Sequence, residues 1–145
     1  MSFVFDIRRG LGGFALIVIS VLSPVHAETY VEISTGGNHS CALLASGVQC
    51  WGFNGNAQLG NGTTSSSGTP VAVLGITTAL SVSAGNSHSC ALLASGSVQC
   101  WGLNGSGQLG NGTTTSSSTP VAVSGITTAA SVSAGGNHSC ALLAS

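Results

Sequence analysis

The sequence predicts an all-β protein built from repeats. A segment that starts at His39 returns almost unchanged from His88, and it begins a third time at His138. The spacings His39–His88, Trp51–Trp101 and Pro70–Pro120 are 49, 50 and 50 residues. A fixed period of this length is typical of repeat architectures, in which each unit needs neighbours to cover its apolar face. Abundant Val, Ile and Thr between glycine-rich turns favour strands over helices within each unit.

The second repeat shows the predicted elements most clearly. Ser81–Ala84 alternates polar and small apolar residues as a half-buried strand does, and a turn leads to a second strand at His88–Leu92. Val98–Trp101 is the third strand. A loop with Asn-Gly pairs, which favour positive φ, and a polar connector over 113–119 follow it. The fourth strand is predicted at Pro120–Val123, with proline at its first position. Four short antiparallel strands per repeat are the content of one β-propeller blade.

The N-terminal segment, residues 1–27, is predicted to be a secretory signal peptide. Arg8 and Arg9 precede an apolar run over 12–22 that is too short to span a membrane as a helix, and Val25-His26-Ala27 offers a cleavage site. An uncleaved anchor is the alternative interpretation. Cleavage after Ala27 would leave a mature chain that is secreted or held at the cell surface, with the periplasm as a further location and no membrane contact.

Charge is almost absent from the repeats, which excludes several classes of function. The charged residues all precede Ile33: Asp6, Arg8, Arg9, Glu28 and Glu32. The remaining sequence has no carboxylate pair for acid–base catalysis or glycoside hydrolysis, no carboxylates for a hard cation and no basic surface for nucleic acid. We therefore expect no catalytic residues, no cofactor and no nucleic-acid partner. A surface so close to neutral also favours self-association.

The repeat resembles the regulator of chromosome condensation (RCC1) type of β-propeller repeat. The shared pattern is G-x-x-H-S-C-A-L-L-A-S-G-(S)-V-Q-C-W-G-x-N-G-x-x-Q-L-G-N-G-T, followed by T-P-V-A-V. The resemblance covers the chain from about Ile33 to its end. It implies a propeller of four-stranded antiparallel blades, and the export signal points to a secreted, bacterial-like member.

The chain holds about two and a third repeats within a predicted domain of residues 28–145. Their bounds are about 33–81, 82–131 and a partial 132–145. This number leaves the propeller incomplete. We expect either a fragment of a longer protein, which is the simpler interpretation, or a ring assembled from several chains.

The cysteines are predicted to form one disulfide in each full repeat. A four-residue loop, 44–47, would place Cys41 opposite Cys50, and a loop lengthened by Ser97 would place Cys90 opposite Cys100. Opposed positions in an antiparallel pair are close enough to bridge, and export favours oxidation. Free buried thiols and a metal site remain as alternatives. Cys140 is left unpaired, which is a further reason to expect a fragment.

Histidine and tryptophan recur at fixed places in the repeat. His39, His88 and His138 each stand two residues before a cysteine, but a structural zinc site needs four ligands and one blade offers at most three. We expect no metal, and a hydrogen-bonding role for the histidines between strands. Trp51 and Trp101 are expected to pack in the core or between blades, with ligand recognition as the alternative.

The resemblance implies a protein-binding role, since members of this family bind diverse protein partners. We expect a non-catalytic interaction module, and the alternative is a guanine nucleotide-exchange factor for a small GTPase. Over the 45 aligned positions Cys41–Gly85 only seven residues differ between the repeats, apart from the inserted Ser97. Differences in the loops mark candidate binding residues, with neutral drift as the alternative explanation: Phe53, Asn56 and Ala57 against Leu103, Ser106 and Gly107. Asn-x-Ser/Thr motifs occur at Asn38, Asn61, Asn104, Asn111 and Asn137.

Overall fold

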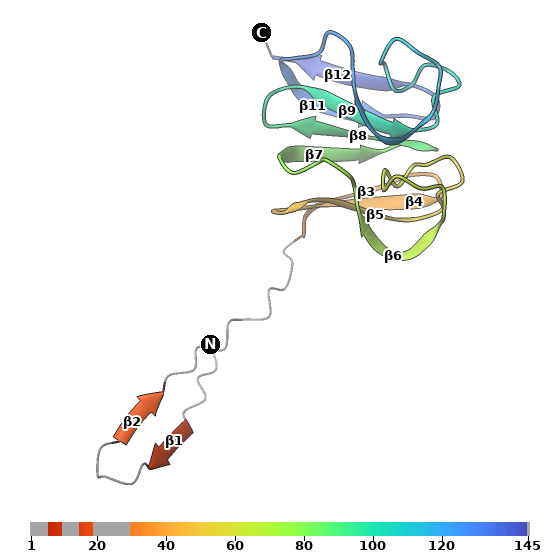
Figure 1. The fold of residues 1–145 in the computed structure, drawn as a ribbon. Coiled ribbons are helices and arrows are strands. Elements are labelled where there is room, and N and C mark those ends of the chain that lie inside the picture. The colour runs from red at the N-terminus through yellow and green to blue at the C-terminus, as the bar shows by residue number, and fades with distance from the viewer. Residues whose placement is uncertain (1–5, 10–14, 19–29, 145) are drawn as a thin grey trace.

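The computed structural model describes residues 6–9, 15–18 and 30–144, and three sheets stack on one another between residue 30 and residue 144 (Figure 1). The predicted cleavage site after Ala27 lies outside the described residues. Within the predicted signal peptide, β1 (Asp6–Arg9) pairs with β2 (Ala15–Val18) as a separate antiparallel sheet. No helix long and apolar enough to cross a membrane occurs in the described part of the chain.

Each sheet is a meander in which strands pair in the order of the sequence. Blade 1 consists of β3 (Tyr30–Thr35), β4 (His39–Leu44), β5 (Gly47–Gly52) and β6 (Ser67–Ala72). Blade 2 consists of β7 (Ala79–Ala84), β8 (His88–Leu93), β9 (Val98–Gly102) and β10 (Ser117–Ala122). The third unit, blade 3, comprises β11 (Ala129–Ala134) and β12 (Ser139–Leu143). The predicted fold class, an all-β incomplete propeller of four-stranded antiparallel blades, is confirmed.

Two local predictions about the blades are wrong. The fourth strand of blade 2 begins at Ser117, so Pro120 lies inside β10. Proline is tolerated there because β10 is the outer edge strand of its sheet. The register of β10 also shifts between Ser117 and Val121, so no backbone N–H is needed from Pro120 for the pairing with β9. The loop of blade 1 is also shorter than predicted, since pairing continues to Leu44↔Gly47 and leaves a turn of only Ala45 and Ser46.

The apolar core lies between the blades. The face of blade 1 that meets blade 2 buries Leu43, Val48 and Leu59, and Val82 and Trp101 of blade 2 pack against it. The equivalent residues of blade 2, Leu92, Val98 and Leu109, form a second cluster with Ala129 and partly buried neighbours from blade 3. A single blade therefore has a one-sided apolar face, and stability comes from stacking.

The two predicted cysteine pairs are joined in the structure. Cys41 is bonded to Cys50 and Cys90 to Cys100, with Cα–Cα distances of 4.1 and 4.0 Å. Both pairs stand directly opposite each other in the strand register. Each bridge closes a loop of about ten residues, for which the chain-entropy model gives roughly 2.5–3 kcal/mol. Cys140 on β12 is free and exposed.

We expect peptide mapping to recover only the bridges Cys41–Cys50 and Cys90–Cys100. Pepsin digestion without reductant is the suitable measurement, because the repeats contain no Lys or Arg for trypsin, while Leu and Trp residues lie between the cysteines. A reduced digest serves as the control. Recovery of a Cys50–Cys90 bridge would show that the strand register differs from the one described.

Candidate functional site

The long loop of each repeat is organised around one buried asparagine. In blade 1 the Asn54 side chain donates through Nδ2 to the carbonyl oxygens of Thr63 and Ser65, both at 3.0 Å, and its Oδ1 accepts from the Leu59 amide at 2.9 Å. Asn104 makes the same three bonds in blade 2. A buried amide with these partners ties the two halves of a loop that has no ladder of its own. The loops are therefore rigid platforms.

The predicted binding residues differ in how far they are exposed. The Phe53 side chain is 47% exposed and its ring lies over the backbone of Gly55, whereas Leu103 at the equivalent position is partly buried. Ser106 is exposed and Asn56 partly so. Ala57 is only 5% exposed, so its side chain offers no contact surface, and its φ of 64° is one that Gly107 adopts more easily at 76°.

A chain of buried hydrogen bonds joins blade 1 to blade 2. His39 Nε2 on β4 lies 2.8 Å from Ser89 Oγ on β8, and the same hydroxyl donates to the Gln58 carbonyl at 3.1 Å. The Trp101 indole nitrogen donates to that carbonyl at 2.9 Å. We call His39, Ser89, Trp101 and the Gln58 carbonyl, which Ser89 and Trp101 share, the His–Ser–Trp relay. Since the Ser89 hydrogen goes to Gln58, Ser89 accepts from His39, which places the proton on Nε2.

The relay recurs between blade 2 and blade 3 without its tryptophan. His88 Nε2 lies 2.9 Å from Ser139 Oγ, which donates to the Gln108 carbonyl at 2.9 Å. The sequence predicted that the histidines would link strands. The structure places that link between blades, because each ring reaches from one blade to a serine of the next.

Burial keeps the first two histidines neutral. Burial, with a smaller contribution from the nearby His88, lowers the pKa of His39 from its ordinary value of 6.5 to about 4. Burial also lowers the pKa of His88, with a smaller contribution from His138. A neutral ring suits the relay, because Nε2 then donates to the serine while no buried positive charge has to be desolvated.

The inner strands of the blades are linked by side chains that accept from backbone amides. The Glu32 carboxylate accepts from the Val82 amide and from the Ser81 hydroxyl, both at 3.1 Å. Ser34 accepts from the Ala84 amide at 3.0 Å. In the sequence, Glu32 stands out only as the last charge before the repeats. Its position opposite the start of β7 becomes apparent only when the blades are stacked.

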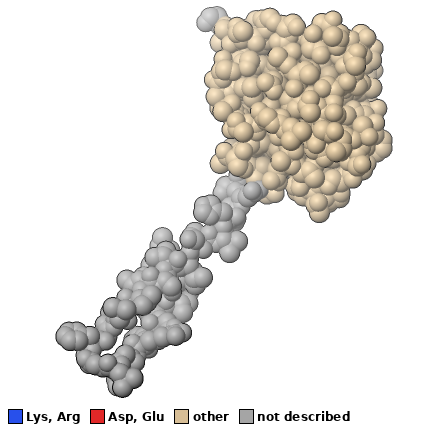
Figure 2. All heavy atoms as spheres, in the orientation of Figure 1, with Lys and Arg blue, Asp and Glu red and all other residues tan. Residues whose placement is uncertain are grey.

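The surface of the stacked blades offers neutral polar groups. The face seen in Figure 2 shows no charged side chain over the blades. No cluster of three or more His, Cys, Asp or Glu side chains fit to hold a metal occurs among the residues that the structure describes. Asn104 is fully buried, so its Asn-x-Ser motif is closed to glycosylation in the folded chain.

Two family models for the regulator of chromosome condensation (RCC1) repeat match the chain. One covers residues 47–92 and 95–142, and the other covers residues 30–58 and 80–108. Together the two segments of the first model span well over half of the chain.

Several solved structures share the fold. Human WBSCR16 is 24% identical over 90% of this chain with a TM-score of 0.73, and Prp20p from Saccharomyces cerevisiae is 19% identical over 93% with a TM-score of 0.72. The yeast RCC1 protein (Prp20) in its structure with Kap60 is 22% identical over 90% with a TM-score of 0.67. The matches cover 35%, 36% and 30% of those chains, so this chain spans about a third of their length.

We expect Ser89→Ala to lower the free energy of unfolding by about 1–3 kcal/mol, because it leaves buried His39 Nε2 without a partner. Urea unfolding followed by circular dichroism measures the effect. The matched control is Ser40→Ala at the equivalent, partly exposed position of blade 1, for which we expect less than about 0.5 kcal/mol. Equal losses in the two variants would contradict a structural role for the relay.

We expect the unfolding free energy to fall as the pH decreases from about 7 to about 4. In this window the unfolded chain binds protons at His39 and His88, while the folded chain, with lowered pKa values, resists them. Protonation therefore favours the unfolded state, by up to about 3 kcal/mol for His39. Urea titrations at several pH values provide the slope.

The double variant His39→Gln/His88→Gln should lose most of this slope. The control is Thr114→Gln, an exposed substitution that removes no titratable group and should leave the slope unchanged. An unaltered slope in the double variant would assign the pH dependence to other groups.

Proposed function

Because the chain belongs to the family of proteins with regulator of chromosome condensation (RCC1) repeats, we propose that it is a non-catalytic protein-interaction module that acts outside the cell or at its surface. The observation that carries the proposal is the rigid loop platform. Each long loop is held by a buried asparagine and presents exposed neutral side chains, while the strands behind it are fixed by disulfides. Loops on a rigid scaffold are the usual location of binding residues.

Similar proteins support a protein partner. Prp20p is described with binding to Gsp1p and histones, and yeast RCC1 (Prp20) with Kap60 bound to it. The partner of this chain must suit a nearly uncharged surface, because Ile33–Ser145 contains no Asp, Glu, Lys or Arg. We expect recognition through amide, hydroxyl and aromatic groups, without long-range electrostatic steering.

An extracellular or periplasmic location is supported by two features. Two cysteine pairs are bonded in the structure, and disulfides persist in oxidising compartments. The sequence also predicts the signal peptide 1–27. An oxidising location argues against the alternative function, nucleotide exchange on an intracellular small GTPase.

We expect the double variant Phe53→Ser/Leu103→Ser to lose its protein partner in a pull-down from the extracellular milieu. The reason is that Phe53 is the large apolar side chain exposed at the loop of blade 1. The matched control is Leu74→Ser, because Leu74 is equally exposed at 49% and the second repeat already carries Ser124 there.

A nucleotide-release assay with a Ran-type GTPase separates the two functions. Accelerated release would restore the exchange factor and refute the proposal. Equal capture by wild type and the loop variant would move the binding surface away from these loops.

A further inference from the structure

The turn between β3 and β4 meets the long loop of blade 1 at one surface. The Phe53 amide donates to the Asn38 carbonyl at 2.8 Å, so the start of the loop lies against this turn. The Phe53 ring covers Gly55, and a Cβ added to Gly55 would lie 3.0 Å from Phe53 Cε1. The ring is nevertheless 47% exposed. Because the loop behind it is held by the buried Asn54, a flat apolar ring is fixed at the surface.

Exposed amide groups lie around this ring. Asn38 is exposed in the turn, and Asn56 on the long loop is partly exposed. From blade 2, the exposed Asn86 places its side chain over Gly37, where an added Cβ would lie 3.2 Å from Asn86 Cγ. Among the residues that the structure describes, none donates to or accepts from the side-chain amides of these three asparagines. We call the following residues the ring–amide surface: Asn38, Phe53, Asn56 and Asn86.

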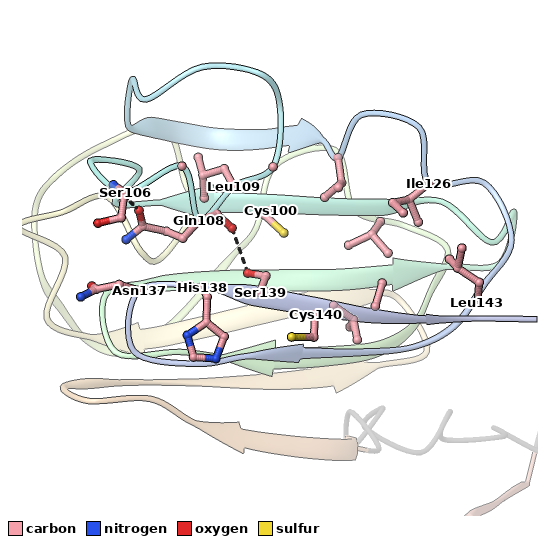
Figure 3. A pocket seen from close by; sticks show the side chains of 16 residues that line it. Cys100, Ser106, Gln108, Leu109, Ile126, Asn137, His138, Ser139, Cys140 and Leu143 are labelled. Carbon is pink, nitrogen blue, oxygen red and sulfur yellow. Dashed lines mark hydrogen bonds between the residues drawn. The ribbon is translucent and has the colours of Figure 1, made fainter.

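The equivalent place on blade 2 has the same backbone bonds but different side chains. The Leu103 amide donates to the Ser87 carbonyl at 2.9 Å, and the Ser106 amide donates to Gln108 Oε1 at 2.9 Å (Figure 3). The corresponding bonds in blade 1 measure 2.8 and 3.0 Å. The side chains differ at each position of the surface: Ser87 stands for Asn38, Leu103 for Phe53, Ser106 for Asn56 and Gly136 for Asn86. The ring and the planar amides therefore occur together at blade 1 and not at blade 2.

The composition of this surface suits a neutral sugar. One face of a pyranose ring consists of CH groups, which pack against the negative face of an aromatic ring. The hydroxyl groups at the rim of the sugar need partners that donate and accept, and a side-chain amide does both. Sugar acids would gain no ion pair, because Ile33–Ser145 contains no Lys or Arg.

A protein surface fits this place less well than a sugar does. A protein–protein interface of standard size buries about 800 Å² on each partner around a desolvated apolar core. The ring–amide surface instead places one aromatic ring among polar groups and exposed glycine. Such a surface matches a short oligosaccharide, in which CH groups and hydroxyl groups alternate.

We propose that the ring–amide surface binds a neutral oligosaccharide carried by the partner of this chain. One pyranose packs on the Phe53 ring, and the surrounding asparagine amides hydrogen-bond to its hydroxyl groups. This inference rests on the proposed protein-binding function, and it names the chemical group that the partner presents to the loop of blade 1. Binding is non-covalent and needs no co-reactant.

The test measures the binding of neutral trisaccharides to the full chain by isothermal titration calorimetry. The probes are cellotriose, maltotriose, mannotriose and chitotriose, and trigalacturonic acid is the charged comparator. We expect at least one neutral probe to bind with a Kd on the order of 1 mM or lower, and trigalacturonic acid to bind at least about tenfold more weakly.

Substitutions at Phe53 separate the ring from the rest of the loop. Phe53→Ala should weaken binding of the neutral probe by at least about tenfold, whereas Phe53→Tyr keeps the ring and should stay within about threefold of wild type. The matched control is Leu103→Ala at the equivalent position of blade 2, which should leave binding unchanged.

A second pair of variants moves the ring without removing it. A Cβ at Gly55 would collide with the Phe53 ring, whereas a Cβ at Gly105 would meet nothing within 4 Å. Neither glycine has a positive φ, so alanine fits the backbone at both positions. We expect Gly55→Ala to weaken trisaccharide binding by at least about fivefold and Gly105→Ala to leave it unchanged. Thermal unfolding of both variants checks that the blades remain folded.

Several results would overturn the inference. They are the failure of all four neutral probes to bind, equal binding by wild type and Phe53→Ala, and tighter binding of trigalacturonic acid than of the neutral probes. Equal capture of the protein partner before and after enzymatic removal of its glycans would assign the surface to protein contact. That outcome would refute oligosaccharide recognition and leave the proposed function standing, whereas a chain that captures no partner and binds no trisaccharide would refute both.

Discussion

The stack depends on the requirement that the carbonyl and hydroxyl groups buried between blades find partners, although His39 Nδ1 and Gln58 Nε2 are buried there without one. The carbonyl of Gln58 lies where blade 1 meets blade 2, and it accepts from both Ser89 and Trp101. His39 completes the network by donating to Ser89. Because an unpaired buried polar group costs about 1–3 kcal/mol, these bonds fix the position of one blade on the next more sharply than apolar contact does. The apolar clusters hold the blades together, and the hydrogen bonds of the relay fix the position of each blade on the next.

The same requirement explains how a nearly uncharged chain maintains long loops. Asn54 and Asn104 replace the missing ladder by bonding to backbone groups on both sides of their loops. Among the residues that the structure describes, Glu32 is the one carboxylate used in the stack, and it accepts from a backbone amide and a hydroxyl rather than from a cation. Hydrogen bonds from neutral amides and hydroxyls therefore hold the loops and blades in place, a role to which ion pairs also contribute in most proteins.

Much of the fold could be predicted because the same order of strand and turn residues occurs in both full repeats. Strand order, blade content and the positions of Cys41 opposite Cys50 follow from periodicity and hairpin length. Interactions between blades could not be predicted in the same way, since they join residues 31 to 51 positions apart that no local pattern connects. Ser89 is the clearest example: its sequence neighbours suggest an ordinary strand residue, and its role depends on Gln58 in another blade.

The edge and the loops show two further limits of prediction from sequence. The sequence predicts a strand start at Pro120 because proline cannot donate to a ladder, but an outer edge with a shifted register tolerates proline equally well. Among the loop residues, the difference between Ala57 and Gly107 predicts a binding role. Burial and the positive φ of Ala57 show instead that this position is under backbone constraint.

The relay has a consequence for how such a chain reaches its folded state. The residues of the first interface recur with little change in the second, so the face of blade 1 that accepts Ser89 can accept Ser139 with the same hydrogen bonds. A folding chain then has a second way to dock its first blade, which keeps the serine bonds but lacks the hydrogen bond from the Trp101 indole. The tryptophan and the length of the connecting segment together favour the correct neighbour. Near-identical repeats can thus use the same interface more than once, but a folding chain then has more than one docked arrangement available.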